Sequence, residues 1–253
     1  MREYTLRYTK FGWIFIGPED DCDIIVDAML TTGYNEEFCI ALDWDPLFIA
    51  RLMKAGFLIM SETMNDVDEE GTIFKRDIVL PKLHLGRSAL YFGNLHVKRS
   101  IKRHLSRYEL RFDTDFNTIM DKCLKTHGEG WLTPSLVQTL FLLRPDHLLH
   151  KWSGEPILKP VEFPLPVSFS LYRNGHLVAG EFGVISGRVY TSYSGYKEEN
   201  NAGTVQMILM VRALEEAGFA FLDFGMPLDY KTDLGALDIS PEKFTILFRA
   251  AQI

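Results

Sequence analysis

One aspartate stands where the surrounding sequence would place a catalytic carboxylate. Asp223 follows the apolar run 219–222 and precedes Phe224-Gly225, so the pattern predicts that it ends a strand beside a turn. Carboxylates at the carboxyl ends of central strands often belong to binding or catalytic sites. Asp223 is therefore the candidate catalytic residue. The alternative is that it caps a turn or pairs with a basic residue.

The densest basic segment of the chain spans residues 96–104. A helix over 97–107 would place Arg99, Lys102 and Arg103 on one face, where they could contact the phosphates of a nucleic acid. The alternative is a solvated helix face without a ligand. The candidate phosphate-binding residues are Lys98, Arg99, Lys102, Arg103 and Arg107.

A polar and aromatic stretch, Thr191–Tyr196, ends another predicted strand. Its tyrosines could stack on a base or on an aromatic side chain and so line a pocket. The alternative is an ordinary loop. Tyr193 and Ser194 are the candidate substrate-binding residues of this stretch. Glu181 is a further carboxylate, but the sequence does not place it near Asp223.

The sequence lacks the motifs of the common cofactors and nucleophiles. It has no GxSxG, no GxxxxGK[ST] loop and no GxGxxG loop after a strand. Residues 200–204 resemble only weakly the glycine-rich loop that holds the pyrophosphate of coenzyme A in acetyltransferases. Cys22, Cys39 and Cys123 are scattered and have no histidine at metal-ligand spacing. We therefore expect no cofactor, no metal, and free thiols in a reducing compartment.

Composition limits the class of protein. The chain has 253 residues, 47% of them hydrophobic and 24% charged, with a formal net charge of −7. An acidic chain lacks a general footprint for nucleic acid, so any RNA binding must come from a local basic patch. No apolar run is long enough to span a bilayer, and the first residues have no signal-peptide core. We expect a cytoplasmic protein without a membrane partner.

The elements that must position these residues differ between the two halves. The first half predicts helices over 24–30, 46–55, 97–107, 114–127 and 134–143, and an acidic surface loop over 62–72. The second half predicts strands over 167–172, 176–185, 187–193 and 219–224, with a buried helix over 204–217. Strands followed by a buried helix and a further strand predict a mixed sheet in an α+β fold.

Six short segments occur in a characteristic order along the chain. Arg87 falls on the last residue of a WWSPDPR-like motif, Leu95–Ser100 resembles LH[VI]SRS, and Gly130–Thr133 resembles GTWIT. Further segments are Gly180–Val184 (GG-[LM]-YGV), Leu222–Phe224 (the start of LID-x-Q) and Leu234–Ile239 (SLGA-x-x-I). Collinear over roughly residues 38–250, they resemble the motifs of the leucyl/phenylalanyl-tRNA–protein transferases.

The resemblance implies both a fold and a reaction. It implies an N-terminal α+β subdomain, here residues 1–62, and a GNAT-like acyltransferase domain over 63–253 with its core at 165–250. It implies transfer of leucine, phenylalanine or methionine from aminoacyl-tRNA to the N-terminus of a protein, which creates a degradation signal. The basic segment would meet the tRNA. The substrate-binding residues would be Tyr193, Ser194, Gly225, Tyr230, Trp131 and Arg87.

Four polar positions of the family motifs differ in this chain. Tyr193 replaces the glutamate of GESMFS, Gly225 the glutamine of LID-x-Q, Ser170 the glutamate of HS[VI]E, and Tyr230 the histidine before SLGA. Transfer from an ester mainly requires an amine held against the carbonyl, so Asp223 could still help to remove the proton. We expect Asp223 at the rim of a pocket. The alternatives are an inactive or repurposed relative that binds tRNA or peptide, and an acyltransferase with another donor.

Overall fold

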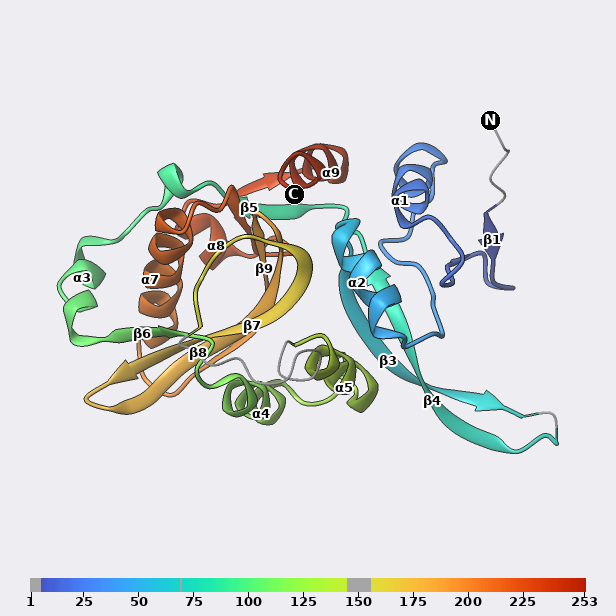
Figure 1. The fold of residues 1–253 in the computed structure, drawn as a ribbon, viewed down its shortest axis with the longest axis horizontal. Helices are drawn as coiled ribbons and strands as arrows, with labels where there is room; N and C mark the ends of the chain where they lie inside the picture. The colour runs from blue at the N-terminus through green and yellow to red at the C-terminus, as the bar shows by residue number, and fades with distance from the viewer. Residues whose placement is uncertain (1–5, 69, 145–155) are drawn as a thin grey trace.

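The computed structural model describes residues 6–68, 70–144 and 156–253. A mixed β-sheet with flanking helices carries most of the second half of the chain, and helices with a long β-hairpin carry the first (Figure 1). This arrangement confirms the predicted α+β class. The short strands β1 (Arg7–Tyr8) and β2 (Ile14–Phe15) pair with each other near the N-terminus.

Two predicted helices of the N-terminal part begin after aspartate caps. α1 (Cys22–Thr31) follows Asp21, whose side chain accepts hydrogen bonds from backbone N–H groups of the first turn. α2 (Pro46–Lys54) follows Asp45 and has its proline in the first turn. Gly56, with a φ of 101°, provides the left-handed residue that lets the chain leave α2.

A β-hairpin replaces the surface loop expected over 62–72. β3 (Leu58–Val67) and β4 (Ile73–Lys82) pair antiparallel along their whole length, and they project from the body of the molecule (Figure 1). The loop prediction is wrong for the strand residues because cross-strand pairs stabilise polar side chains there, such as the 3.0 Å ion pair between Arg76 and Asp66. The expected boundary after residue 62 falls inside β3.

The main sheet has seven strands within the described residues, in the order β11-β5-β10-β9-β8-β7-β6. β10 runs parallel to β9, and the other neighbours are antiparallel, so the sheet is mixed as predicted. Two of its strands come from outside the expected core at 165–250. The strands are β5 (Arg87–Leu90), β6 (Glu109–Phe112), β7 (Val161–Arg173), β8 (His176–Gly187), β9 (Val189–Lys197), β10 (Phe221–Asp223) and β11 (Leu237–Ile239).

Helices cover both faces of this sheet. α7 (Ala202–Glu216) lies on one face, and α4 (Phe116–His127) and α5 (Pro134–Leu142) lie on the other (Figure 1). α7 connects β9 to β10 and buries Val205 and Ile208 in the core on its side of the sheet. The predicted buried helix over 204–217 is therefore confirmed, with ends shifted by one or two residues.

Gly183 of β8 has no room for a side chain. A Cβ there would lie 2.2 Å from the Thr191 carbonyl oxygen and 2.7 Å from the Tyr190 ring. We expect Gly183→Ala to lower the free energy of unfolding by roughly 1–3 kcal/mol, the usual effect of overpacking. Urea denaturation would measure the change. Gly93→Ala is the matched control, because a Cβ at Gly93 meets nothing within 4 Å; equal stability of the two variants would contradict the tight contact.

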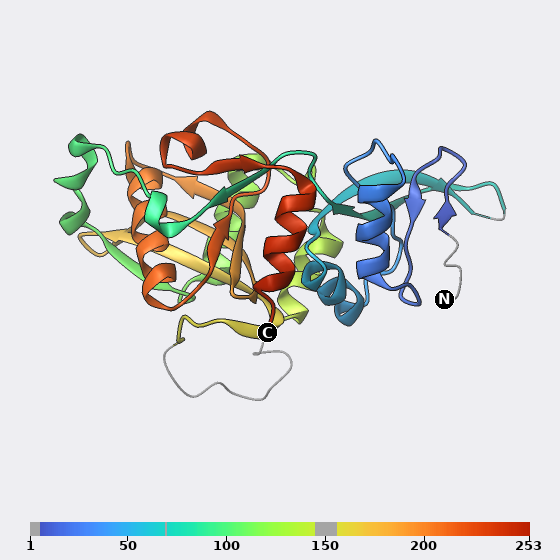
Figure 2. The ribbon, with the colours of Figure 1, turned by 90° about the horizontal axis from the view of Figure 1, so that it is seen from above.

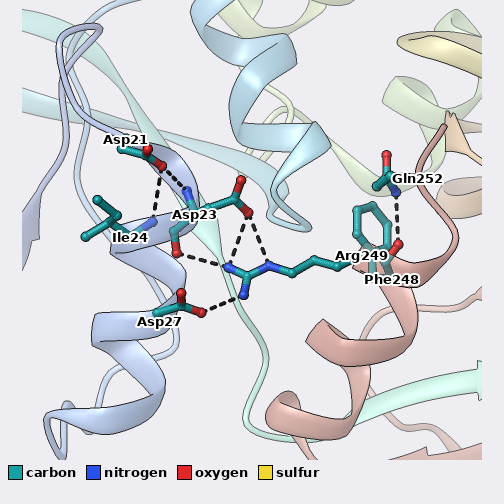
Figure 3. Close-up of polar contacts among 7 residues, drawn as sticks. All are labelled: Asp21, Asp23, Ile24, Asp27, Phe248, Arg249 and Gln252. Atoms are coloured by element: carbon teal, nitrogen blue, oxygen red, sulfur yellow. Dashed lines mark hydrogen bonds and ion pairs between the residues drawn. The ribbon is translucent and has the colours of Figure 1, made fainter.

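Helix α9 (Pro241–Ala250) connects the sheet to the N-terminal part. Figure 2 shows α9 between the sheet and α1. Arg249 of α9 donates to the Asp27 carboxylate at 2.7 Å and to the Asp23 carbonyl oxygen at 3.0 Å (Figure 3). These groups are partly exposed, so each ion pair contributes less than about 1 kcal/mol. The larger contribution comes from a continuous apolar core that includes Ile25 of α1 and Phe248 of α9.

The predicted helix over 97–107 is wrong as a single helix. The structure has a short α-helix, α3 (Arg99–Lys102), followed by a 3₁₀-helix, η2 (Leu105–Arg107). A continuous helix would stack like charges four residues apart, with Arg103 next to both Arg99 and Arg107, and such pairs destabilise a helix. The chain must also be extended from Glu109 onward to pair with β7.

Candidate functional site

Asp223 lies at the end of β10 and is completely buried. Its Oδ1 accepts a hydrogen bond from Arg87 Nε at 2.8 Å, and its Oδ2 accepts one from Arg87 Nη2 at 2.6 Å. Thr191 Oγ1 and the Gly225 N–H donate to the same carboxylate, each at 2.9 Å. Burial alone would raise the pKa of Asp223, but the Arg87 guanidinium and these donors lower it below its ordinary value.

The position of Asp223 differs from the pocket rim that the sequence suggested. Residue 223 pairs with Ala89 of β5, so the side chain of Arg87, at the start of the same strand, reaches its carboxylate inside the fold. Both carboxylate oxygens are engaged by partners within the chain. The geometry is that of the alternative considered above, in which the aspartate pairs with a basic residue. Asp223 can therefore act on a substrate only through the groups that it holds.

Arg87 is itself held on several sides. It is 1% exposed, and its guanidinium carbon lies 4.2 Å from the centre of the Phe244 ring of α9. This distance is that of a cation–π contact. Among the described residues its Nη1 atom has no hydrogen-bond partner although it is buried. Arg87 thus joins three elements, β5, β10 and α9, at one charged centre.

Tyr193 occupies a β-bulge at the edge of this centre. Phe182 pairs with Ser194 and Gly183 pairs with Ser192, which leaves Tyr193 without a partner on β8. Its hydroxyl oxygen accepts a hydrogen bond from the Ile59 N–H at 3.1 Å, which leaves the hydroxyl's own proton unused by that contact. Desolvation raises the pKa of Tyr193, which keeps the hydroxyl protonated.

The other expected substrate-binding residues lie in different parts of the fold. The Trp131 ring lies 6.4 Å from the Tyr193 ring, centre to centre. The Ser194 carbonyl oxygen faces the Cys123 thiol of α4 at 3.5 Å. Tyr230, half exposed, lies on α8 (Asp229–Asp233), directly after the loop that follows Gly225.

Two further ionisable residues are buried in this part of the fold; sequence reasoning named Glu181 without placing it and did not identify Lys231. Lys231 of α8 is 5% exposed, and its Nζ donates to the Phe224 and Met226 carbonyl oxygens at 2.6 and 2.7 Å. Glu181 of β8 is 4% exposed and accepts a hydrogen bond from the Tyr190 hydroxyl at 3.1 Å. Burial raises the pKa of Glu181. A lysine between aspartates in a short polar helix gave no signal of burial.

Lys231 makes stability depend on pH in the alkaline range. Burial lowers its pKa from 10.5 to about 8, although Asp223 and Glu181 act in the opposite direction. Between these two values the unfolded chain holds a proton that the folded chain has lost, so the free energy of unfolding rises with pH. We expect this rise in the wild type and not in Lys231→Gln, by urea denaturation from pH 7.5 to 10.5. Lys125→Gln, which changes an exposed lysine, should keep it; parallel curves for all three proteins would contradict the assignment.

The basic segment, defined as Lys98, Arg99, Lys102, Arg103 and Arg107, lies at the far end of the molecule from the hairpin (Figure 1). All five side chains are exposed despite the break between α3 and η2. Lys98 Nζ lies 2.5 Å from the Asp233 carboxylate of α8. This contact connects the basic segment to the short helix that carries Tyr230 and Lys231.

A model of the leucyl/phenylalanyl-tRNA protein transferase family matches residues 89–249. The chain belongs to this family. The match includes Asp223 and the basic segment, and it begins just after Arg87. Membership in this family confirms the resemblance drawn from the motifs.

Individual relatives cover part of the chain. The leucyl/phenylalanyl-tRNA–protein transferase of Pseudomonas putida (strain W619) is 31% identical over 163 residues, which are 62% of this chain and 65% of the relative. The protein of the same name from Azotobacter vinelandii is 27% identical over 164 residues, 63% of this chain and 65% of the relative. The chain thus spans about 65% of the length of these curated relatives.

Two solved structures are similar over most of the chain. The C-terminal domain of a putative lysylphosphatidylglycerol synthetase from Agrobacterium fabrum has a TM-score of 0.37 and 13% identity, covering 98% of this chain and 74% of that one. L-PGS from Bacillus licheniformis has a TM-score of 0.43 and 11% identity, covering 97% and 88%.

Both residues of the buried pair fall on motif positions of the family. The chain keeps the motif residues Arg87, at the start of β5, and Asp223, at the end of β10, and their side chains bond to each other. Among the described residues, no helix combines the length and the apolar composition needed to cross a membrane. Across the same residues, no three His, Cys, Asp or Glu side chains are grouped as they would be around a metal ion.

Proposed function

We propose that this chain is an aminoacyl-tRNA–protein transferase of the cytoplasm. It moves an amino acid of the leucine, phenylalanine or methionine type from aminoacyl-tRNA to the N-terminus of a protein, and so marks that protein for degradation. The observation that carries this proposal is the family match over 89–249, which includes Asp223 in its buried pair with Arg87. We propose in addition that the sheet, with α7 between the parallel strands β9 and β10, is GNAT-like.

The reaction needs few groups beyond correct placement of the two substrates. The acceptor amine nitrogen bonds to the ester carbon, the ester C–O bond breaks, and the proton lost by the amine reaches the ribose oxygen through the neighbouring ribose hydroxyl. The Tyr193 hydroxyl, which uses its oxygen but not its proton within the chain, donates to the oxygen that gains negative charge. Asp223 holds Arg87, Thr191 and the Gly225 turn in place around it.

One observation favours a second candidate, a relative that binds tRNA or peptide without transfer. Asp223 is 0% exposed, and both of its oxygens are engaged by partners within the chain. A carboxylate in that state cannot touch an amine directly. This candidate keeps the basic segment and drops the reaction.

A transfer assay separates the two candidates. Labelled leucyl-, phenylalanyl- and methionyl-tRNA are each offered with peptides that begin with Arg, Lys, Asp or Glu, and labelled peptide is counted. The proposal expects label in at least one combination. Absence of label in all twelve, with tRNA still bound, would favour the second candidate.

The basic segment is proposed to contact tRNA phosphates. We expect the double variant Lys102→Glu/Arg107→Glu to bind tRNA at least about tenfold more weakly at low salt. The slope of log K against log salt should fall by about two, one for each lost contact. The control is Lys125→Glu/Lys243→Glu, which makes the same charge change at exposed residues of α4 and α9. Equal weakening in both variants would show that net charge alone matters.

A further inference from the structure

In the turn after Asp223, Gly225 faces the ring of His84. Gly225 has a φ of 69°, and a Cβ built on it would lie 3.2 Å from Leu58 Cδ1 and 3.7 Å from His84 Nε2. A side chain at position 225 would therefore meet the His84 ring. Because residue 225 is glycine, no side chain fills the space beside the ring. The polar atom nearest to the Cβ position of Gly225 is His84 Nε2.

A carboxylate on the other side of the ring fixes its orientation. His84 Nδ1 lies 3.4 Å from Glu37 Oε2, and Lys82 Nζ lies 2.9 Å from the same oxygen. The tautomer that donates from Nδ1 to Glu37 leaves a lone pair on Nε2. Among the described residues, no hydrogen-bond partner of Nε2 is found. His84 is 5% exposed, and Nε2 is not one of its fully buried atoms, so this unpartnered acceptor touches solvent.

The charges around the ring keep it neutral. Burial lowers the pKa of His84 to about 4, and the cations Arg87 and Lys82 add to this, while Glu37 and Asp223 oppose it. The imidazole is therefore uncharged at neutral pH and offers Nε2 as an acceptor. A neutral acceptor can bind an N–H group without a second positive charge on the ring.

The residues that follow His84 and Gly225 in the chain are both exposed at the surface. Leu85, next to His84, is 57% exposed, and Met226, next to Gly225, is 52% exposed. Gly86 and Pro227 lie against each other between them, since a Cβ on Gly86 would be 3.3 Å from Pro227 Cγ. Both segments that meet at His84 and Gly225 thus have a solvent-exposed neighbour.

We propose that His84 Nε2 binds the α-amino group of the acceptor protein, with Glu37 orienting the ring from behind. The amine donates one N–H to Nε2 and presents its nitrogen lone pair toward the ester carbonyl near Tyr193. This inference rests on the proposed transferase function, but the amine contact itself does not require the donor. It assigns the acceptor site to the seam between β4, β5 and the turn after β10.

The contact can be observed directly in the unmodified protein. The full chain is labelled with ¹⁵N-histidine, and the Nε2 resonance of His84 is identified by its loss in His84→Gln. Peptides beginning with Arg, Lys, Asp or Glu are added, each with a free or an acetylated α-amine. We expect at least one free-amine peptide to shift the Nε2 resonance and its acetylated form to leave it unchanged. The exposed His176 is the internal control and should not respond.

Kinetics give the second readout. In the transfer assay we expect His84→Leu to raise the KM for the acceptor peptide at least tenfold while leaving the Kd for tRNA unchanged. His84→Gln, which keeps an acceptor oxygen, should recover part of this loss. His176→Gln should match the wild type.

The outcomes separate the two proposals. An Nε2 resonance that no free-amine peptide shifts, or that acetylated peptides shift equally, overturns the amine site even if transfer occurs. An Nε2 resonance that responds in a protein without transfer activity supports the amine site and rejects the transferase function. An unchanged acceptor KM in a folded His84→Leu protein would also overturn the amine site.

Discussion

We expect Arg87→Leu to lower the free energy of unfolding by about 3–5 kcal/mol. The substitution leaves the Asp223 carboxylate fully buried and without its cation, and removes both of its arginine hydrogen bonds. A buried charge without a partner cannot recover its hydration. Thr191 and the Gly225 N–H remain as donors, but they are neutral and cannot replace the lost attraction.

Removing both charges should restore much of the lost stability. The double variant Arg87→Leu/Asp223→Leu has no isolated charge, so we expect it to be more stable than Arg87→Leu alone. Urea denaturation of the wild type, both single variants and the double variant gives the coupling energy of the pair. Arg249→Leu is the control at an exposed ion pair and should cost less than about 1 kcal/mol. Additive losses in the cycle would mean that the two residues do not stabilise each other.

The pair should also fail in acid. The pKa of Asp223 in the folded chain lies below its ordinary value of 3.8. Its contribution is therefore complete above the unfolded pKa and is lost as pH falls through the lower folded value. In Arg87→Leu, burial without the arginine raises the pKa of Asp223. The difference in stability between wild type and Arg87→Leu should therefore shrink as pH falls through the raised pKa of the variant.

Local patterns predicted the second half of the fold well. β8 is rich in apolar and small residues and α7 is apolar nearly all round, and each was predicted with ends close to those observed. The strands β5 and β6 were not predicted, because each has only four residues and acquires its conformation by pairing with β10 or β7. Such pairing depends on tertiary contacts that a short window of sequence does not contain.

The candidate site was predicted only in its residue types. Asp223 and Arg87 were each selected from motifs, but they are 136 positions apart and nothing local indicates that they bond. His84 had no signal, since its role depends on Gly225 lacking a side chain and on Glu37 lying behind the ring. Lys231 resembled a surface lysine. Burial of such groups follows from how the β10 turn packs against neighbouring segments.

The second large effect concerns the rate of transfer. If the chain is a transferase, we expect Asp223→Asn to lower the transfer rate by at least about a hundredfold while tRNA binding stays unchanged. The buried carboxylate does not touch the amine, so the loss comes from displacement of the groups that it holds. A displacement of about 1 Å in a catalytic site can cost about a hundredfold in rate. An asparagine amide has one acceptor oxygen, so it cannot accept from Arg87 Nε, Arg87 Nη2, Thr191 and Gly225 as the carboxylate does.

The measurement must separate lost rate from lost folding. Transfer is followed at a temperature well below the midpoint of thermal unfolding of the variant, with the folded fraction checked by circular dichroism. Thr191→Val removes one donor and leaves the ion pair, so its rate should fall less than tenfold and serves as the matched control. The rate of the wild type should show no titration of Asp223 near neutral pH, because its pKa is lowered. A folded Asp223→Asn protein that transfers at the wild-type rate would show that the buried pair serves the fold alone and that the site needs no positioning by Asp223.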